Sequence, residues 1–206
     1  MRDRGRLGPL EWATAGRPFP GEEACGDRAV VIDSGAGTGL LAVIDGLGHG
    51  PAAAVAADLA AETIADNRGE PLAALMLLCH QSLTETRGAA ITLAAYADGA
   101  VQWAGVGNVT ATLVASTANG SRSVSSAPLS SGVVGYLYPQ TLQQMTLPMH
   151  TGDLLVLVSD GIVGDYLDQV DLAKPAEVIA AEILRRCAKP TDDAMVLTAR
   201  HRGAVV

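Results

Sequence analysis

An apolar run that ends in Asp and Gly occurs twice in this sequence, and this repeat constrains the fold more than any other feature. The run LLAVI at residues 40–44 leads directly into the Asp-Gly pair at 45–46, and the run LLVLV at residues 154–158 leads, after one serine, into the Asp-Gly pair at 160–161. Short apolar runs predict buried strands, and Asp-Gly is a turn signal. Each pair is therefore either ordinary turn chemistry or a carboxylate delivered to the end of a strand.

The length and composition predict one closely packed globular domain. The chain has 206 residues, of which 49% are hydrophobic but only 3% aromatic, so its core must be built from Ala, Val, Leu and Ile. We expect residues 1–206 to form a single domain, in which the polar residues 1–20 are an N-terminal arm or an edge strand.

The charge and the cysteines exclude several classes of protein. A net charge of -8 and a pI near 4.8 argue against a nucleic-acid or anionic membrane partner, because phosphate backbones need a basic surface. Cys25, Cys79 and Cys187 are widely spaced, which predicts neither a disulfide framework nor a zinc site and favours a reducing cytoplasm. The longest apolar run, residues 72–79, is too short to span a bilayer, and we expect no targeting or anchoring segment.

The sequence VVIDSGAGTGL at residues 30–40 is similar to the first strand and glycine loop of a Rossmann-type methyltransferase. In that fold the loop leads directly into a helix, but a helix that began at Thr38 would be stopped by Gly46 and Gly48. We therefore predict a β-hairpin over residues 29–45 with a glycine turn. An S-adenosylmethionine-dependent methyltransferase remains the less favoured alternative.

Proline and glycine mark most of the other expected elements. Pro51 begins an alanine-rich helix, and Pro71 begins a second helix for which Gly88 is the expected C-terminal cap. Asp98 and Gly99 predict the turn of a second hairpin. Further expected elements are a strand at 110–115, turns with one strand at 116–132, strands at 142–147 and 154–158, a short helix at 162–167, a helix from Pro175 and a closing strand at 194–198.

Acidic residues adjoin three of the expected strands. Asp45 and Asp160 follow strands, and the pair Asp192 and Asp193 precedes one. If these strand ends gather at one edge of a sheet, their carboxylates repel each other, and a divalent cation removes that cost. Two such ions about 3.5–4 Å apart can lower the pKa of a shared water and direct it at phosphorus. The pattern is thus typical of a two-metal phosphohydrolase.

The ordered motifs resemble those of the metal-dependent protein phosphatases of the bacterial SpoIIE type, relatives of the eukaryotic protein phosphatase 2C group. The motifs are DGLGHG at 45–50, SDG at 159–161 and DDA at 192–194, with Gly26 and Asp27 ahead of them, and the resemblance runs from about residue 21 to 199. Within that family the short chain and the segment GVGNV at 105–109 are most similar to the RsbX-type phosphatases of the stressosome signalling system.

The resemblance implies an α+β fold, a four-layer αββα sandwich of two antiparallel sheets flanked by helices. It also implies two Mn²⁺ or Mg²⁺ ions per active site. Their expected ligands are Asp45 bridging both ions, the Gly46 carbonyl on the second, Asp160 and Asp192 on the first, Asp193 as the alternative to Asp192, and Asp27 on the second ion through water.

The sequence also departs from the family pattern. Relatives with a third metal have aspartates where this chain has Asn108 and Gly164, so a third site would need Asp165 as a substitute. His49 stands three residues after Gly46, whereas the eukaryotic group has a histidine directly after its Asp-Gly, so His49 is a candidate either for proton donation and positioning or for shaping the turn. No counterpart of the phosphate-binding arginine is evident.

These inferences predict a cytoplasmic protein serine/threonine phosphatase that uses a metal-activated hydroxide directly, without a covalent intermediate. Its expected substrate is a phosphorylated signalling protein of the stressosome or STAS-domain type. The non-enzymatic alternative is a phosphatase fold that acts as a binding module.

Overall fold

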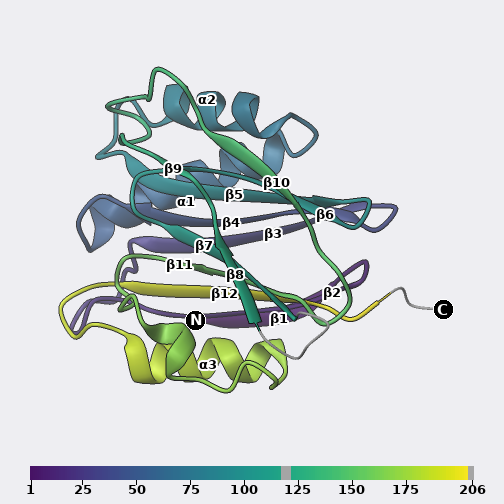
Figure 1. The fold of residues 1–206 in the computed structure, drawn as a ribbon. Coiled ribbons are helices and arrows are strands. Elements are labelled where there is room, and N and C mark those ends of the chain that lie inside the picture. The colour runs from purple at the N-terminus through teal and green to yellow at the C-terminus, as the bar shows by residue number, and fades with distance from the viewer. Residues whose placement is uncertain (117–121, 204–206) are drawn as a thin grey trace.

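A computed structural model describes residues 1–116 and 122–203. Two six-stranded sheets pack face to face, with helices α1 and α2 outside one sheet and α3 outside the other (Figure 1). This is the expected four-layer αββα sandwich. The small parallel strand β9 (Leu129–Ser130) is an addition that pairs with β6.

The first sheet has the strand order β1-β2-β12-β11-β7-β8, and each neighbouring pair is antiparallel. Its strands are β1 (Arg2–Leu7), β2 (Leu10–Arg17), β12 (Ala194–His201), β11 (Leu154–Val158), β7 (Thr110–Ser116) and β8 (Arg122–Ser126).

The second sheet has the order β10-β6-β5-β4-β3, again antiparallel throughout. Its strands are β10 (Gln144–Pro148), β6 (Ala100–Val106), β5 (Ala89–Ala97), β4 (Thr38–Gly46) and β3 (Asp27–Gly35).

Three apolar clusters separate the four layers. The cluster between the sheets includes Leu41, Trp103 and Leu157, all fully buried. Alanines dominate the face that α1 (Pro51–Asp66) turns to the second sheet, next to α2 (Leu72–Ser82), while α3 (Ala176–Cys187) covers the first sheet. None of the helices in the described residues has the length and apolar character needed to cross a membrane.

The N-terminal residues are part of the sandwich. They form the hairpin β1–β2, in which β1 is an edge strand and β2 lies between β1 and β12. Of the two expectations for residues 1–20, the strand is therefore found and the free arm is not, because Leu7 and Leu10 are fully buried in the central core.

The predicted hairpin at residues 29–45 is confirmed as β3 and β4. Ala36 and Gly37 form its turn with φ of 51° and 76°, the left-handed pair that a two-residue hairpin requires. No helix follows the glycine loop, so the Rossmann-type alternative is wrong.

Two local predictions need correction. Residues 162–167 hold only the single 3-10 turn η1 (Tyr166–Asp168) rather than a short helix. Helix α2 ends at Ser82, so Gly88 is not its cap; instead Gly88, with φ of 79°, introduces β5 and accepts a hydrogen bond from the backbone N–H of Leu47. Part of the predicted 116–132 stretch, residues 117–121, lies outside the described residues.

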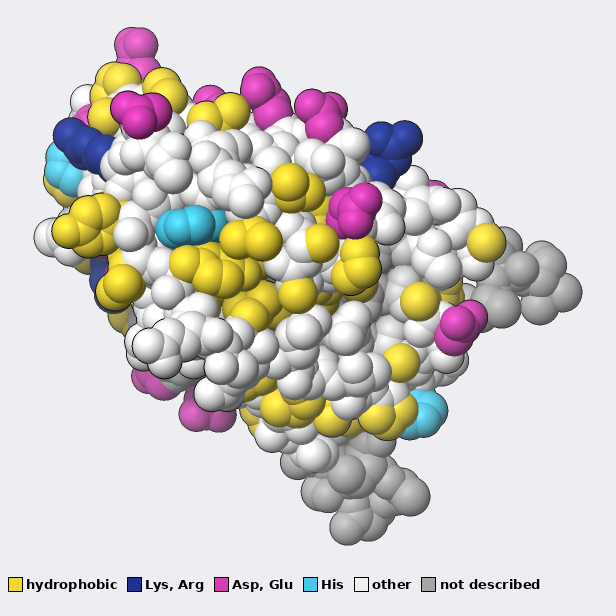
Figure 2. All heavy atoms as spheres, turned by 90° about the horizontal axis from the view of Figure 1, so that it is seen from above, with side chains coloured by type: hydrophobic (Ala, Val, Ile, Leu, Met, Phe, Trp, Pro, Cys, Tyr) yellow, Lys and Arg dark blue, Asp and Glu magenta, His cyan; other side chains and the backbone are white. Residues whose placement is uncertain are grey.

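The outer face above α2 has no basic footprint. In Figure 2, acidic side chains line much of its margin, apolar side chains lie between them, and the described part of the face shows no continuous basic patch. This agrees with the net charge of -8.

Glycines allow the acidic strand ends to lie against neighbouring backbone. A Cβ atom on Gly46 would lie 2.2 Å from the Ala53 carbonyl oxygen, and one on Gly161 would lie 1.8 Å from the Asp193 carbonyl oxygen. Real Cβ atoms do not approach that closely, so any side chain at Gly161 would push Asp160 away from the start of β12.

We expect Gly161→Ala to lower the free energy of unfolding by about 1–3 kcal/mol, because the backbone must shift to admit the methyl group. Gly164→Ala is the matched control, three residues along the same loop and with no atom within 4 Å of its Cβ position. Urea denaturation measures both variants, and equal stability of the two would contradict the close approach at Gly161.

Candidate active site

Strand direction brings the acidic residues to one end of the sandwich. Asp27 begins β3 and Asp45 lies near the end of β4, and the two are direct partners in this antiparallel pair. In the other sheet Asp160 follows β11 and Asp192 precedes β12, and these two strands are also antiparallel neighbours. Asn108 lies at the same end because it joins β6 of one sheet to β7 of the other.

Three of the predicted residues line one cavity of about 210 Å³. These are Asp45, Asp160 and Asp192, and they come from both sheets. The cavity is also lined by Leu47, Gly48, Ala90 and Asn108.

Asp27 lies behind this cavity in a buried hydrogen-bond chain. It is only 2% exposed, and its Oδ2 accepts a hydrogen bond of 2.6 Å from the Ser159 hydroxyl. The Ser159 hydroxyl in turn accepts one of 2.9 Å from the backbone N–H of Met195. Ser159 thus ties a carboxylate of the second sheet to two strands of the first.

Burial and mutual repulsion make the negative charges costly. Burial, followed by the charges of Asp27, Asp160 and Asp192, raises the pKa of Asp45 from 3.8 to about 9. Burial is also the main reason that the pKa of Asp27 rises from 3.8 to about 7, opposed by its hydrogen bond from Ser159. The pKa of Asp192 is raised as well, by burial and by Asp160. A bound cation would relieve this cost.

The chemistry of these side chains fits a hard divalent cation, because carboxylate oxygens are the ligands that Mg²⁺ and Mn²⁺ prefer. Within the described residues, however, no three His, Cys, Asp or Glu side chains lie close enough together to enclose an ion. Asp160 accepts a 2.6 Å hydrogen bond from the Asn108 amide, and Asp27 is held by Ser159. Two of the four acids are therefore held by hydrogen bonds from neighbouring side chains.

The two members of the acid pair have different surroundings. Asp192 lines the cavity, whereas Asp193 is 2% exposed and its Oδ1 accepts a 2.8 Å hydrogen bond from the backbone N–H of Phe19. The other carboxylate oxygen of Asp193 is buried and has no hydrogen-bond partner among the described residues. This arrangement favours Asp192 as the ligand and gives Asp193 the task of fixing the segment before β3.

His49 faces away from the cavity. Its ring stacks on Phe19, with centroids 4.4 Å apart, and its Nδ1 is paired with the carboxylate of Glu22. His49 is not among the residues that line the cavity. These contacts favour the structural interpretation, in which His49 shapes the turn, over proton donation.

Arg87 is a candidate that the sequence analysis missed. A Cβ atom placed on Gly48 would lie 3.0 Å from Arg87 Nη1, so the guanidinium lies beside Gly48, a residue that lines the acidic cavity, although Arg87 itself does not line it. Arg87 is exposed and precedes β5, whose first residue, Ala89, pairs with Gly46 at the end of β4. The antiparallel order of β4 and β5 was the signal that could have found it.

A third metal site gains little support from the residues in question. Asn108 lines the cavity but donates to Asp160 rather than offering a carboxylate. Asp165 and Gly164 are exposed, and neither lines the acidic cavity.

The sandwich and the acids at its strand ends define the class: this is the fold of the PP2C-type serine/threonine phosphatases. The family model for stage II sporulation protein E (SpoIIE) matches residues 35–202, and the chain belongs to this family. No curated protein sequence matches the chain.

Solved structures agree with this assignment. A chain from work on the bacterial stressosome, described as a modular system adapted to control secondary messenger signalling, is 34% identical, with a TM-score of 0.83 over 93% of this chain and 99% of that one. RsbX in complex with magnesium is 21% identical, with a TM-score of 0.81 over 97% and 99%. The PP2C phosphatase domain of SpoIIE from Bacillus subtilis is 16% identical, with a TM-score of 0.77 over 100% of this chain and 66% of that one.

The acidic cluster predicts how stability depends on pH. Asp27 and Asp45 keep their protons to about pH 7 and 9 in the folded protein but lose them near 3.8 in the unfolded chain. The stability that these two protonated carboxyl groups contribute to the folded protein is complete below about pH 4 and is lost as the pH rises through 7 and 9. In EDTA we therefore expect the Tm to fall between pH 5 and 9, and excess Mg²⁺ or Mn²⁺ to raise it by an increment that grows with pH.

Differential scanning calorimetry measures this dependence. The double variant Asp27→Asn, Asp45→Asn is the control and should show a flatter pH profile and a smaller cation effect. If the Tm of the metal-free wild type follows the same pH profile as that of the double variant, the pH-dependent loss of stability does not come from these two carboxylates.

Proposed function

We propose that this chain is a Mn²⁺- or Mg²⁺-dependent protein serine/threonine phosphatase acting in cytoplasmic signalling. The observation that carries the proposal is the convergence of Asp45, Asp160 and Asp192 on one cavity from two different sheets. Membership of the SpoIIE family and the magnesium complex of RsbX support the same chemistry. We also propose that residues 1–206 act as one domain, since β2 is integrated between β1 and β12.

Each side chain then has a definite task. Asp45, Asp160 and Asp192, with the Gly46 carbonyl, would hold the two cations. Asp27, which is buried and hydrogen-bonded by Ser159, would support the second cation through water. When bound, the cations supply a water nucleophile of low pKa and withdraw charge from the phosphoryl group.

The partner is the least constrained part of the proposal. Stressosome proteins and the RsbU and RsbW domains of a Mycobacterium tuberculosis protein occur among the structural neighbours. A phosphorylated stressosome or STAS-domain protein is therefore the substrate class that we propose. The net charge of -8 disfavours a phosphorylated partner unless cations in the site offset the repulsion.

Hydrolysis of an aryl phosphate with and without Mn²⁺ tests the activity. We expect Asp45→Asn and Asp160→Asn to lower kcat more than about 100-fold, since each loses a cation ligand. Asp165→Asn, an exposed acid on the loop after β11, should retain wild-type activity. Unchanged turnover in both site variants would contradict the two-metal mechanism, and a wild type that binds phosphoprotein without turnover would identify the chain as a binding module.

Arg87 is the candidate for the phosphate-binding arginine, for which the sequence motifs show no counterpart. Its guanidinium lies at Gly48, and the described residues offer it no ion pair. An arginine in this position can donate two hydrogen bonds to the phosphate oxygens of an incoming substrate.

We expect Arg87→Ala to raise the KM for a phosphopeptide about tenfold or more, because charge-assisted hydrogen bonds to phosphate are lost. Arg68→Ala, an exposed arginine just beyond α1, is the matched control and should leave KM unchanged. Steady-state kinetics separates KM from kcat. A KM for Arg87→Ala equal to that of the control would show that the cations alone bind the phosphate.

A further inference from the structure

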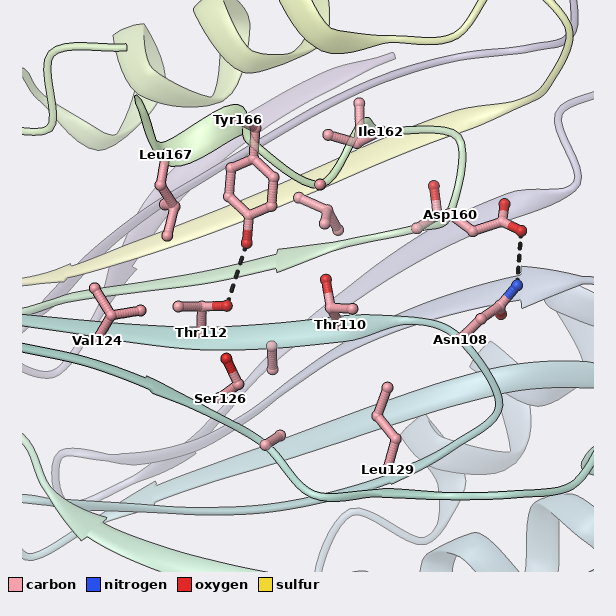
Figure 3. A pocket seen from close by; sticks show the side chains of 15 residues that line it. Asn108, Thr110, Thr112, Val124, Ser126, Leu129, Asp160, Ile162, Tyr166 and Leu167 are labelled. Atoms are coloured by element: carbon pink, nitrogen blue, oxygen red, sulfur yellow. Dashed lines mark hydrogen bonds between the residues drawn. The ribbon is translucent and has the colours of Figure 1, made fainter. Parts of the chain in front are cut away.

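A second cavity, of about 500 Å³, adjoins the acidic one on the outer face of the first sheet. Asn108 and Asp160 line both cavities. Figure 3 shows the outer cavity extending from these two residues along β7, with Tyr166 and Leu167 on the opposite wall.

The groove exists because the helical layer over the first sheet is incomplete. Helix α3 packs mainly on β2 and β12, while the single turn η1 covers β11 and the edge of β7. Tyr166 anchors that turn, since it is 4% exposed and its hydroxyl donates a 3.3 Å hydrogen bond to Thr112 Oγ1. The outer face of β7 and β8 is left open beside it.

The lining is apolar and hydroxylic. Thr110, Thr112 and Ser126 present hydroxyl groups, and Val124, Val158 and Leu167 present apolar surface. Asp160, at the end shared with the acidic cavity, is the one charged residue among the described residues that line the groove. Val124 is 55% exposed, so its apolar side chain is accessible to a ligand in the groove. Such a surface suits an uncharged, apolar side chain.

The length of the groove determines how far from the phosphorylated residue a side chain bound in it would lie. Its lining extends from Asn108, on the link between β6 and β7, to Thr112 on β7, four residues along the chain and therefore at most about 14 Å. An extended peptide covers that distance in three or four residues. The adjoining strand β8 is the last strand of its sheet, so its outer edge can accept an extended segment as an added strand.

We propose that this groove is a specificity site that binds an apolar side chain of the phosphoprotein, three or four residues from the phosphorylated serine or threonine. The occupant is a segment of the substrate, because the groove is continuous with the cavity at Asp160 and Asn108 that receives the phosphate. This inference rests on the proposed function and adds a sequence preference to it.

Phosphothreonine peptides test the inference. In a background of Ser and Gly, one Leu is placed in turn at each position from four residues before to four residues after the phosphothreonine. We expect Leu at three or four residues on one side to raise kcat/KM by about tenfold or more over Ser, the usual discrimination for one apolar side chain in a pocket. Hydrolysis of an aryl phosphate, which does not reach the groove, gives the basal activity.

Variants on β8 give a matched comparison. Val124→Asn and Ser126→Asp alter the face that lines the groove, while Ser123→Asp introduces the same charge on the same strand without touching the lining. We expect the first two variants to abolish the preference for Leu and the third to keep it. All three should hydrolyse the aryl phosphate at the wild-type rate.

The outcomes separate this inference from the proposed function. Absence of any preferred Leu position, or a preference that survives in both Val124→Asn and Ser126→Asp, overturns the specificity site even where the aryl phosphate is hydrolysed. If the wild type hydrolyses nothing, the proposed function fails. Fluorescence anisotropy of the same peptides in Mg²⁺ then tests whether the groove binds an apolar side chain. Tighter binding of a Leu peptide that is lost in Val124→Asn supports the specificity site, and equal binding of all peptides overturns it.

Discussion

The crowding of like charges where the two sheets meet is the interaction on which the rest of the site depends. Asp27, Asp45, Asp160 and Asp192 all lie at this end, and burial with mutual repulsion raises the pKa of Asp45 to about 9. The fold tolerates the cluster because Ser159 and Asn108 each donate a hydrogen bond to one carboxylate.

A single topological device supplies both the site and the groove beside it. Antiparallel pairing places the end of one strand beside the start of the next, so β4 and β5 bring Gly48 and Arg87 together and β11 and β12 bring Asp160 and Asp192 together. The link from β6 to β7 at Asn108 joins the two sheets at this end and leads into the groove. Chemistry and sequence preference would then reside on neighbouring segments of one sheet edge.

Particular residues show where sequence reasoning succeeds and fails. The hairpin at 29–45 was predictable because its turn at Ala36 and Gly37 depends only on neighbouring residues, although the same segment is also similar to the glycine loop of a Rossmann-type methyltransferase. His49 was a weaker prediction, since its stacking on Phe19 depends on a segment 30 residues away. Arg87 was not found at all, because it belongs to none of the acid-glycine motifs that follow apolar runs. Its position becomes evident only when β4 and β5 are paired.

The sequence by itself determined the strands, the hairpin turns and the acids that follow apolar runs, because these depend on residues within a few positions of each other. Tertiary structure alone decided that Asp192 rather than Asp193 faces the cavity, that His49 turns away and that Arg87 reaches Gly48. The physical reason is that a strand's periodicity fixes which side chains share a face, but only the pairing and stacking of the sheets fixes what each face meets.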